Sequence, residues 1–294
     1  MTLDYLKKGQ VSIDMSDYVK TMLNDCPATK FKKGKVKTPW NESMFKVKES
    51  SPPLEDHLKE QFHKTTYQGL FLSKRGCLDL MPGIAYYTTC VQNPNWDNWA
   101  KLRQLMSFLN QTKEDKLTLK ADSLNKAVWH TDMAFAVHPD FCSHTGYMMS
   151  FGKGIIISGS KKQKMNMKNS TKAELIRADE AVGPILWILL FLKEQGYDLE
   201  TSILYQDNKS TILLEKNGCS SAGKWSRHLN IRLFFITNQI LKGHINVEYC
   251  PTEEMTADYL SKPMVGAKFK RFRHDIMNLL MPTTVQIAMW CQYA

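Results

Sequence analysis

The spacing of hydrophobic residues divides the chain into a mostly helical first part and a second part in which strands and helices alternate. Over residues 54–110, apolar side chains recur at steps of three and four, for example at Leu102, Leu105 and Leu109, which predicts amphipathic helices. The sequence NPNW within this region predicts a turn between two of them. Before it, residues 10–26 alternate as a strand does and then continue as a short amphipathic helix.

Two polar stretches interrupt these patterns. Residues 29–53 are rich in lysine and punctuated by proline, and they predict a long exposed loop. Two roles are open for this basic loop: a solvated surface, or an arm that contacts a nucleic-acid backbone. The second stretch, from Gln111 to about Asp122, predicts a linker into a second domain that begins near Ala127.

The second part of the chain combines the two-residue period of strands with the longer period of helices. Three strand patterns come first, VWHTDMAFAVH, TGYMMSFGKG and IIISGSKK, and the glycines on either side of Lys153 predict a hairpin turn. A helix follows from about Thr171 to Gln195 and ends at Gly196. The remaining patterns predict a strand (SILYQD), two helices, a strand (INVEYC) and a last helix. This order predicts an α/β fold, a mixed sheet with helices on its faces.

Composition narrows the class of protein. The chain has 294 residues and a formal net charge of +10, which favours a polyanionic partner because basic side chains that face phosphates release counterions. Its seven cysteines are odd in number and lack CxxC spacing, which indicates reduced intracellular thiols rather than disulfides or a zinc site. No apolar run approaches the roughly 20 residues that cross a bilayer, so no membrane association is expected.

Four acidic residues stand in settings that suit metal-holding carboxylates. Asp132 and Asp207 follow apolar strand residues, where a carboxylate needs a compensating charge. Glu174 lies in the first turn of the long predicted helix, and Asp258 begins a late one. Magnesium prefers oxygen ligands, and two such ions about 4 Å apart can activate water and stabilise the leaving oxygen of a phosphodiester. The pattern therefore indicates a two-metal nuclease.

Each of these acids also has a purely structural explanation. Glu174 stands three residues after Thr171, in the arrangement of a capping box in which the glutamate reaches back to a backbone N–H. Asp207 is suited to cap the helix that follows it, and Asp258 is a first-turn aspartate of the kind that the helix dipole favours. The metal-binding and structural explanations both stay open for all of them.

The motifs that carry these acids resemble the ribonuclease H domain of copia-type LTR retrotransposon polyproteins. The resemblance rests on WHTDMAFAVH, SHTGYMMSFGKG, NSTKAEL, LYQDNKS and VEYCPTEEMTADYLSKPM, which occur in this order. Segments further upstream, such as FHKTTYQGLFLSKRGCLDL, resemble the thumb and connection regions of reverse transcriptase. The implied fold is a ribonuclease H-like mixed five-stranded sheet with flanking helices, preceded by a mostly helical region. The expected division is 1–122 (thumb and connection), 127–275 (ribonuclease H) and 276–294 (C-terminal tail).

The resemblance also implies an activity and a set of site residues. The implied reaction is hydrolysis of the RNA strand of RNA/DNA hybrids, with two Mg²⁺ ions, or Mn²⁺ in their place. The catalytic and metal-binding carboxylates would be Asp132, Glu174, Asp207 and Asp258. The implied substrate contacts are Lys161, Lys162, Gln163, Lys164, Asn169, Ser170 and Thr171. The expected setting is intracellular, in a cytoplasmic virus-like particle or the nucleus, with other parts of a reverse transcriptase polyprotein as partners.

Two departures from the family pattern limit these expectations. No Tyr-x-Asp-Asp motif or other palm aspartate cluster is present, so this polypeptide is not expected to synthesise DNA. The segment PTEEMTA before Asp258 has no histidine to match the mobile catalytic histidine of cellular ribonucleases H, which leaves the proton donor unassigned. Two other classes stay open, a non-catalytic nucleic-acid-binding fragment and a DDE-type recombinase. The place of Glu174 early in the long helix, with Asp207 on the next strand, favours ribonuclease H over the recombinase.

Overall fold

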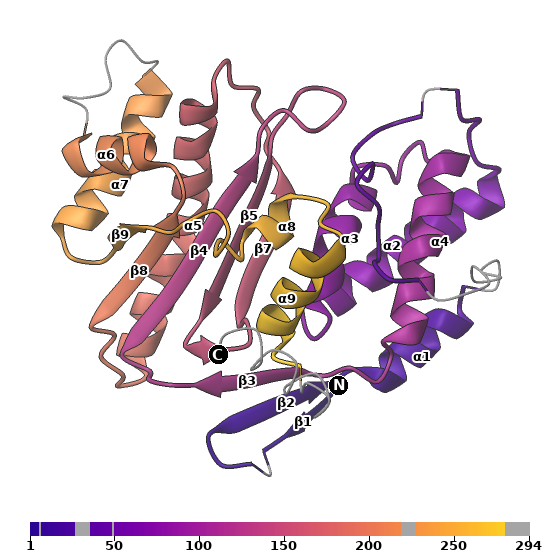
Figure 1. Ribbon diagram of the computed structural model, residues 1–294, viewed down its shortest axis with the longest axis horizontal. Helices are drawn as coiled ribbons and strands as arrows, with labels where there is room; N and C mark the ends of the chain where they lie inside the picture. Colours follow the sequence, from indigo (N-terminus) through magenta and orange to yellow (C-terminus); the bar gives the residue numbers. More distant parts are fainter. Residues whose placement is uncertain (6, 27–35, 49, 219–226, 280–294) are drawn as a thin grey trace.

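A five-stranded mixed sheet organises the second part of the chain (Figure 1). The computed structural model describes residues 1–5, 7–26, 36–48, 50–218 and 227–279. The strands lie in the order β7-β5-β4-β8-β9. Their bounds are β4 (Lys126–Ala134), β5 (His144–Ser150), β7 (Ile157–Lys162), β8 (Thr201–Gln206) and β9 (Asn246–Tyr249). The first three pair antiparallel, whereas β8 runs parallel to β4 and β9 parallel to β8. The predicted fold class is thereby confirmed.

Three helices pack on one face of this sheet. They are α5 (Ser170–Glu194), α6 (Lys209–Asn217) and α7 (Arg227–Leu241). Trp129 of β4 and Met149 of β5 join Leu175 of α5 and Leu233 of α7 in one hydrophobic core. Because side chains alternate across a strand, Met148 points to the opposite face and into a second core. No helix among the described residues is both long enough and apolar enough to span a membrane.

The second core joins the two ends of the chain. Its helices are α1 (Ser16–Asn24), α2 (Asp56–Ser73), η1 (Leu78–Leu80), α3 (Met81–Thr88), α4 (Trp96–Gln111), α8 (Asp258–Ser261) and α9 (Gly266–Met277). The predicted helical character of residues 54–110 is confirmed, and Asn95 of the NPNW turn caps α4 by accepting from the Asn98 backbone N–H. Arg273 of α9 ion-pairs with Asp79 at 2.7 Å and with Asp115 at 2.6 Å. The first 122 residues therefore pack against the C-terminal helices, and the division into domains stays a prediction.

The described part of the predicted basic loop is irregular and its lysines are exposed, as expected, but several of its apolar residues are buried. Trp40, Met44 and Phe45 are buried in the second core. These apolar residues follow neither the helical nor the strand period, because an irregular segment buries its side chains through tertiary contacts that a period does not reveal. Positions 29–35 and 49 of the loop lie outside the described residues.

The predicted linker contains a strand, β3 (Leu117–Ala121). It belongs to a smaller antiparallel sheet of order β1-β2-β3-β6. The other members are β1 (Thr2–Asp4), β2 (Gln10–Asp14) and β6 (Gly152–Lys153). The alternation of Leu117 and Leu119 with polar neighbours is a short strand signal that the surrounding lysines hide. The hairpin of β5 and β7 is confirmed, and its connecting segment carries β6 into the smaller sheet.

Candidate functional site

Asp132 and Asp258 lie close together on the face of the sheet opposite α5. Asp132 is near the end of the central strand β4, and Asp258 is the first residue of α8. Both are almost fully buried, with exposed fractions of 1% and 2%. The ammonium group of Lys262 lies between them, 3.1 Å from Asp132 Oδ2 and 2.7 Å from Asp258 Oδ1. The Ser261 hydroxyl also donates to Asp132, so the C-terminal end of α8 holds this carboxylate in place.

A glycine lets α8 approach the strands this closely. Gly146 of β5 is paired across the sheet with Asp132. A Cβ atom at this position would lie 2.8 Å from the backbone carbon of Leu260 and 2.9 Å from the Ala257 carbonyl oxygen. Contacts this short are closer than carbon atoms tolerate, so only glycine leaves room for the helix backbone. The placement of Asp258 beside Asp132 thus depends on Gly146.

Glu174 and Asp207 form a second acidic pair around a buried arginine. Arg177, one helical turn after Glu174 in α5, has no exposed surface. Its guanidinium lies 2.7 Å from Glu174 Oε2 and 3.7 Å from Asp207 Oδ1. Both acids line a shallow open pocket of about 390 Å³ together with Asn208, Lys209 and Tyr249. This pair therefore reaches the surface, whereas Asp132 and Asp258 are almost fully buried.

Arg177 also ties both central strands together beneath the acids. It donates at 2.9 Å to the carbonyl oxygen of Thr131, the residue before Asp132, and at 2.8 Å to Gln206 Oε1. Gln206 in turn donates at 2.8 Å to Glu215, which is fully buried in α6. Arg177 and Lys262 were not among the residues predicted from the sequence. Their spacing was the available signal, since they stand three residues after Glu174 and four after Asp258, on the same helix face as their acid.

The structural explanations for two of the acids are wrong. Asn169, not Thr171, caps α5, since its side chain accepts from the Lys172 N–H at 3.0 Å. Glu174 is therefore not part of a capping box and turns inward to Arg177. Likewise Asn208, rather than Asp207, caps α6 by accepting from the Thr211 N–H at 3.1 Å. Asp258 does lie in the first turn of α8, but its two carboxylate oxygens are occupied by Lys262 and Lys268.

Burial and neighbouring charges shift the pKa values of three of these acids. Burial raises the pKa of Glu174 to about 7 against the opposing effect of Arg177, and the charges of Asp132 and Asp207 add to the rise. Burial and the charge of Asp132 raise the pKa of Asp258. Burial also acts upward on Asp132, but Lys262 and Arg177 outweigh it and hold its pKa below the usual value. The four carboxylates therefore carry more negative charge than the nearby cationic side chains compensate.

The residues present suit Mg²⁺ by their chemistry, although their arrangement departs from the prediction. All four acids offer hard carboxylate oxygens, and one of them, Glu174 Oε2, is buried beside the Arg177 guanidinium at 2.7 Å. However, no three acidic, histidine or cysteine side chains in the described part of the chain converge closely enough to hold an ion. The acids are divided instead into one pair around Lys262 and one around Arg177. Metal binding here stays a prediction.

The predicted substrate contacts differ in accessibility. Lys164, Asn169 and Ser170 are exposed at the approach to α5, and Thr171 is partly buried. Lys161 pairs with Glu180 at 3.2 Å and Lys162 with Asp140 at 2.5 Å. Gln163 is buried, and its amide nitrogen donates to Thr145 and to the Ala173 carbonyl oxygen. Gln163 thus joins β7 to α5. The residues of this set that are available to a ligand are Lys164, Asn169 and Ser170.

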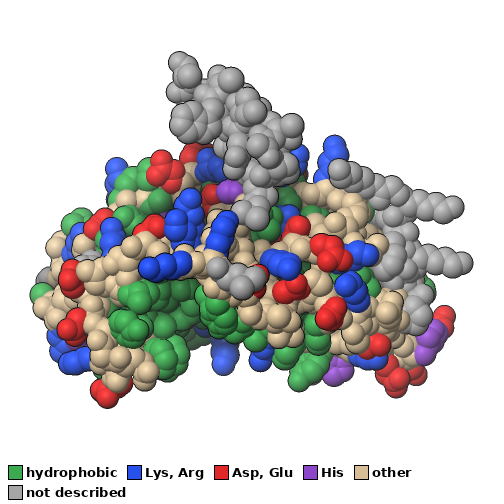
Figure 2. Space-filling model, turned by 90° about the horizontal axis from the view of Figure 1, so that it is seen from below, with side chains coloured by type: hydrophobic (Ala, Val, Ile, Leu, Met, Phe, Trp, Pro, Cys, Tyr) green, Lys and Arg blue, Asp and Glu red, His purple; other side chains and the backbone are tan. Residues whose placement is uncertain are grey.

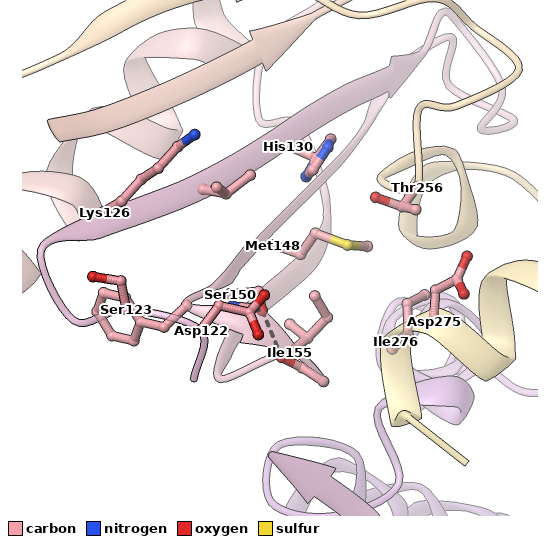
Figure 3. A pocket seen from close by; sticks show the side chains of 14 residues that line it. Asp122, Ser123, Lys126, His130, Met148, Ser150, Ile155, Thr256, Asp275 and Ile276 are labelled. Atoms are coloured by element: carbon pink, nitrogen blue, oxygen red, sulfur yellow. Dashed lines mark hydrogen bonds between the residues drawn. The ribbon is translucent and has the colours of Figure 1, made fainter. Parts of the chain in front are cut away.

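A cavity of about 410 Å³ lies further along the same sheet face as Asp132 (Figure 3). Asp275 and Ile276 of α9 face Lys126 and His130 of β4 across it. Burial lowers the pKa of His130 to about 4, so this histidine is neutral at physiological pH. None of the four acids lines this cavity, and it is separate from the candidate site.

The chain is similar to parts of plant retrotransposon polyproteins. It is 28% identical over 193 residues to the retrovirus-related Pol polyprotein from transposon TNT 1-94 of Nicotiana tabacum. This match covers 65% of this chain and 14% of that protein. It is 27% identical over 226 residues to the corresponding polyprotein from transposon RE2 of Arabidopsis thaliana, covering 74% and 15%. The chain thus spans about one seventh of the length of these relatives. No family model matches it.

Solved structures that overlap with the chain include ribonucleases H. Ribonuclease H1 from Halobacterium salinarum is 17% identical and matches 46% of this chain and 94% of its own, with a TM-score of 0.30. The foamy viral protease-reverse transcriptase in complex with double-stranded DNA is 14% identical and matches 71% and 40%, with a TM-score of 0.41. Because these scores are low, the fold assignment depends on the sheet topology. By its sequence, this chain is similar to a C-terminal part of copia-type retrotransposon Pol polyproteins.

Proposed function

We propose that this chain is a metal-dependent ribonuclease H that hydrolyses the RNA strand of RNA/DNA hybrids. One observation carries the proposal: Asp132 on β4 and Asp207 after β8 stand at the same end of two parallel neighbouring strands. The helix α5, which leads from β7 into β8, brings Glu174 to the same end, and α8 adds Asp258. A cluster of carboxylates from four separate elements is costly to bury unless cations compensate it.

Each acid would have a distinct part in holding the metal ions. Bound ions would supply an activated water and stabilise charge on the leaving oxygen of the phosphodiester. Glu174 and Asp207 would face the bound substrate, since they line the open pocket. Asp132, whose pKa is held below its usual value by Lys262 and Arg177, would be the inner ligand. Because the pKa of Glu174 is raised to about 7, this carboxyl would release a proton when a cation binds near neutral pH.

The hybrid would be held by residues at the edge of this site. Lys209 extends into the open pocket, with its ammonium 4.5 Å from the centre of the Tyr249 ring, where it would meet a phosphate. Lys164, Asn169 and Ser170 are exposed before α5 and offer one cation and two hydrogen-bonding groups. Elsewhere, basic side chains are interspersed with acidic ones on the face seen in Figure 2. We therefore expect the grip on the hybrid to come from the edge of the site.

A second candidate function is non-catalytic binding of nucleic acid. It is favoured by the same feature that departs from the metal prediction: Lys262 and Lys268 already neutralise Asp258, and Lys262 also pairs with Asp132. A protein with this arrangement could keep its acids as internal ion pairs and bind a nucleic-acid backbone through exposed lysines alone.

Cleavage of an end-labelled RNA/DNA hybrid distinguishes the two functions. We expect Mg²⁺-dependent cleavage of the RNA strand by the wild-type protein, with single-stranded RNA and duplex DNA left intact. Asp132→Asn should abolish cleavage, because the inner ligand loses its charge. Asp17→Asn is the matched control, since the Asp17 side chain is 99% exposed and has no part in the proposed site. A folded wild-type protein that binds the hybrid without cutting it, with Mg²⁺ or Mn²⁺, would support the non-catalytic function instead.

A further inference from the structure

The position of Lys262 gives this residue a role that the proposed function does not assign. Its ammonium nitrogen is within ion-pair distance of two of the four acids, Asp132 at 3.1 Å and Asp258 at 2.7 Å. The neighbouring Lys268 is within 4.0 Å of Asp258, at 3.0 Å, and of Glu253, at 3.9 Å. Lys262 therefore bridges the two most buried carboxylates of the cluster with a single positive charge.

A lysine at this point competes with a metal ion for the same oxygens. The ammonium group satisfies carboxylate lone pairs that would otherwise coordinate a cation, and it repels a second positive charge at short range. Burial of the two acids strengthens both effects, because water screens them poorly. The acids correspondingly lie in two pairs, with Asp132 and Asp258 around Lys262, and Glu174 and Asp207 around Arg177.

The Lys262 ammonium group can move away from its carboxylates more freely than the Arg177 guanidinium can. The Lys262 side chain is 38% exposed, whereas that of Arg177 is 0% exposed. Lys262 is the C-cap residue of α8, with an extended backbone, so its flexible stem can swing the ammonium group into solvent without breaking the helix. Arg177 is held by Thr131 and Gln206 as well as by Glu174. Of these two cations, Lys262 is the one that is both close to the two buried acids and able to move away.

We propose that Lys262 is a tethered cation that fills the position between Asp132 and Asp258 in the metal-free protein and must be displaced when a divalent metal binds. This inference rests on the proposed function, because it assumes that the acids bind metal. It makes Lys262 a positioning residue: it stabilises the acids before metal arrives and weakens their affinity for the ion. The affinity of this chain for Mg²⁺ is then set by its own lysine as well as by its carboxylates.

Calorimetric titration with Mg²⁺ tests the inference without any measurement of cleavage. Lys262→Met removes the charge and keeps much of the stem, and it should bind Mg²⁺ about tenfold more tightly than wild type. In the absence of metal the same variant should melt at a lower temperature, because Asp132 loses its main compensating charge. Saturating Mg²⁺ should then raise the melting temperature of Lys262→Met by more than that of wild type.

Three further variants control this experiment. Lys262→Arg keeps the charge and should bind Mg²⁺ as wild type does. Lys268→Met removes the cation that pairs with Asp258 but does not reach Asp132, and it should tighten Mg²⁺ binding by less than Lys262→Met does. Lys262→Gln keeps hydrogen bonds to both acids without charge, so it replaces Lys262→Met if that variant does not fold, and tighter binding is expected for it too.

The outcomes separate the inference from the function on which it rests. Equal or weaker Mg²⁺ affinity in the uncharged variants, with measurable binding by wild type, overturns the role of Lys262 and leaves the metal site in place. Absence of binding by wild type and by the folded Lys262→Met and Lys262→Gln variants overturns both the metal site and the competition. Tighter binding in Lys262→Arg as well would also contradict the inference, because charge would then not be the cause.

Discussion

The indole nitrogen of Trp40 donates a hydrogen bond of 3.0 Å to the carbonyl oxygen of Met264, which lies 224 residues further along the chain. The Trp40 ring also packs edge-on against Tyr259 and Phe269, with ring centroids 5.9 and 6.2 Å apart. Tyr259 belongs to α8, the helix that begins with Asp258. One member of the acidic cluster is therefore held in place by an aromatic residue from the N-terminal part of the chain.

Trp40→Ala is expected to lower the free energy of unfolding by about 3–5 kcal/mol, because it leaves a cavity in a core that both ends of the chain share. Urea denaturation followed by circular dichroism measures this change. Trp96→Ala is the matched control and should cost about 1 kcal/mol or less, since Trp96 is 42% exposed. Similar losses for the two tryptophans would contradict the structural role given to Trp40.

Gly146→Ala tests the close approach of α8 to the sheet. The added methyl group would meet the backbone of Leu260 at 2.8 Å, and backbone cannot move aside as a flexible side chain can. We expect a loss of stability of about 1–3 kcal/mol, and weaker Mg²⁺ binding because Asp258 is displaced from Asp132. Gly183→Ala in α5 is the control, since a Cβ there meets nothing within 4 Å and alanine favours a helix. Thermal denaturation of both variants checks the contrast.

Arg177→Met should destabilise the protein by about 3–5 kcal/mol at pH 7, because it leaves buried acids without their partner and the Thr131 carbonyl without its donor. Arg177→Lys is not expected to restore stability, since a single ammonium group cannot reproduce the planar fork that binds Thr131 and Gln206. For comparison, Arg232→Met removes a partly exposed ion pair with Asp179 and should cost about 1 kcal/mol or less. Guanidinium denaturation ranks the three variants, and a small effect of Arg177→Met would disprove the bridging role.

The sequence indicated the order of strands and helices well because local periods carry that information. Asp132, Glu174, Asp207 and Asp258 could be selected as candidates because each stands at the end of an element, where period and polarity change together. The cationic side chains that pair with these acids could not be predicted from the sequence in the same way. Whether Lys262 pairs with Asp258 alone or also with Asp132 depends on how closely α8 approaches β4, and that distance is set by tertiary packing.

The same limit explains the errors at the N-terminal side. Trp40, Met44 and Phe45 stand in a stretch whose lysines and prolines suggest an exposed loop, and their burial depends on partners such as Tyr259 and Met264. Those partners come more than 200 residues later. Composition averaged over the stretch therefore gave the wrong environment for its few apolar side chains.

Glu215 provides a pH test of the buried network beneath the site. Burial raises its pKa from 4.5 to about 8, so the folded state favours the protonated carboxyl more than the unfolded state does. The contribution of this group to stability is therefore complete below about pH 4.5 and is lost as the pH rises toward 8. Glu174, whose pKa is raised to about 7, acts in the same direction, whereas the buried histidines His130, His138 and His144, whose pKa values are lowered to about 4, 4 and 3, act in the opposite direction below about pH 6.5. The effect of Glu215 is therefore measured as the difference in stability between wild type and a Glu215 variant.

Glu215→Gln should keep the network neutral at every pH, because the amide can still meet Gln206 without a buried charge. We expect this variant to match wild type near pH 4.5 and to exceed its stability by at least about 1 kcal/mol at pH 8. Glu174 and the buried histidines are unchanged in this variant, so their pH dependence cancels in the comparison with wild type. Urea denaturation at several pH values measures both curves, and Glu60→Gln on the surface of α2 should leave the wild-type curve in place. Parallel curves for Glu215→Gln and wild type would mean that Glu215 is already ionised in the fold, and that Arg177 extends its compensation from the acids of the site to α6.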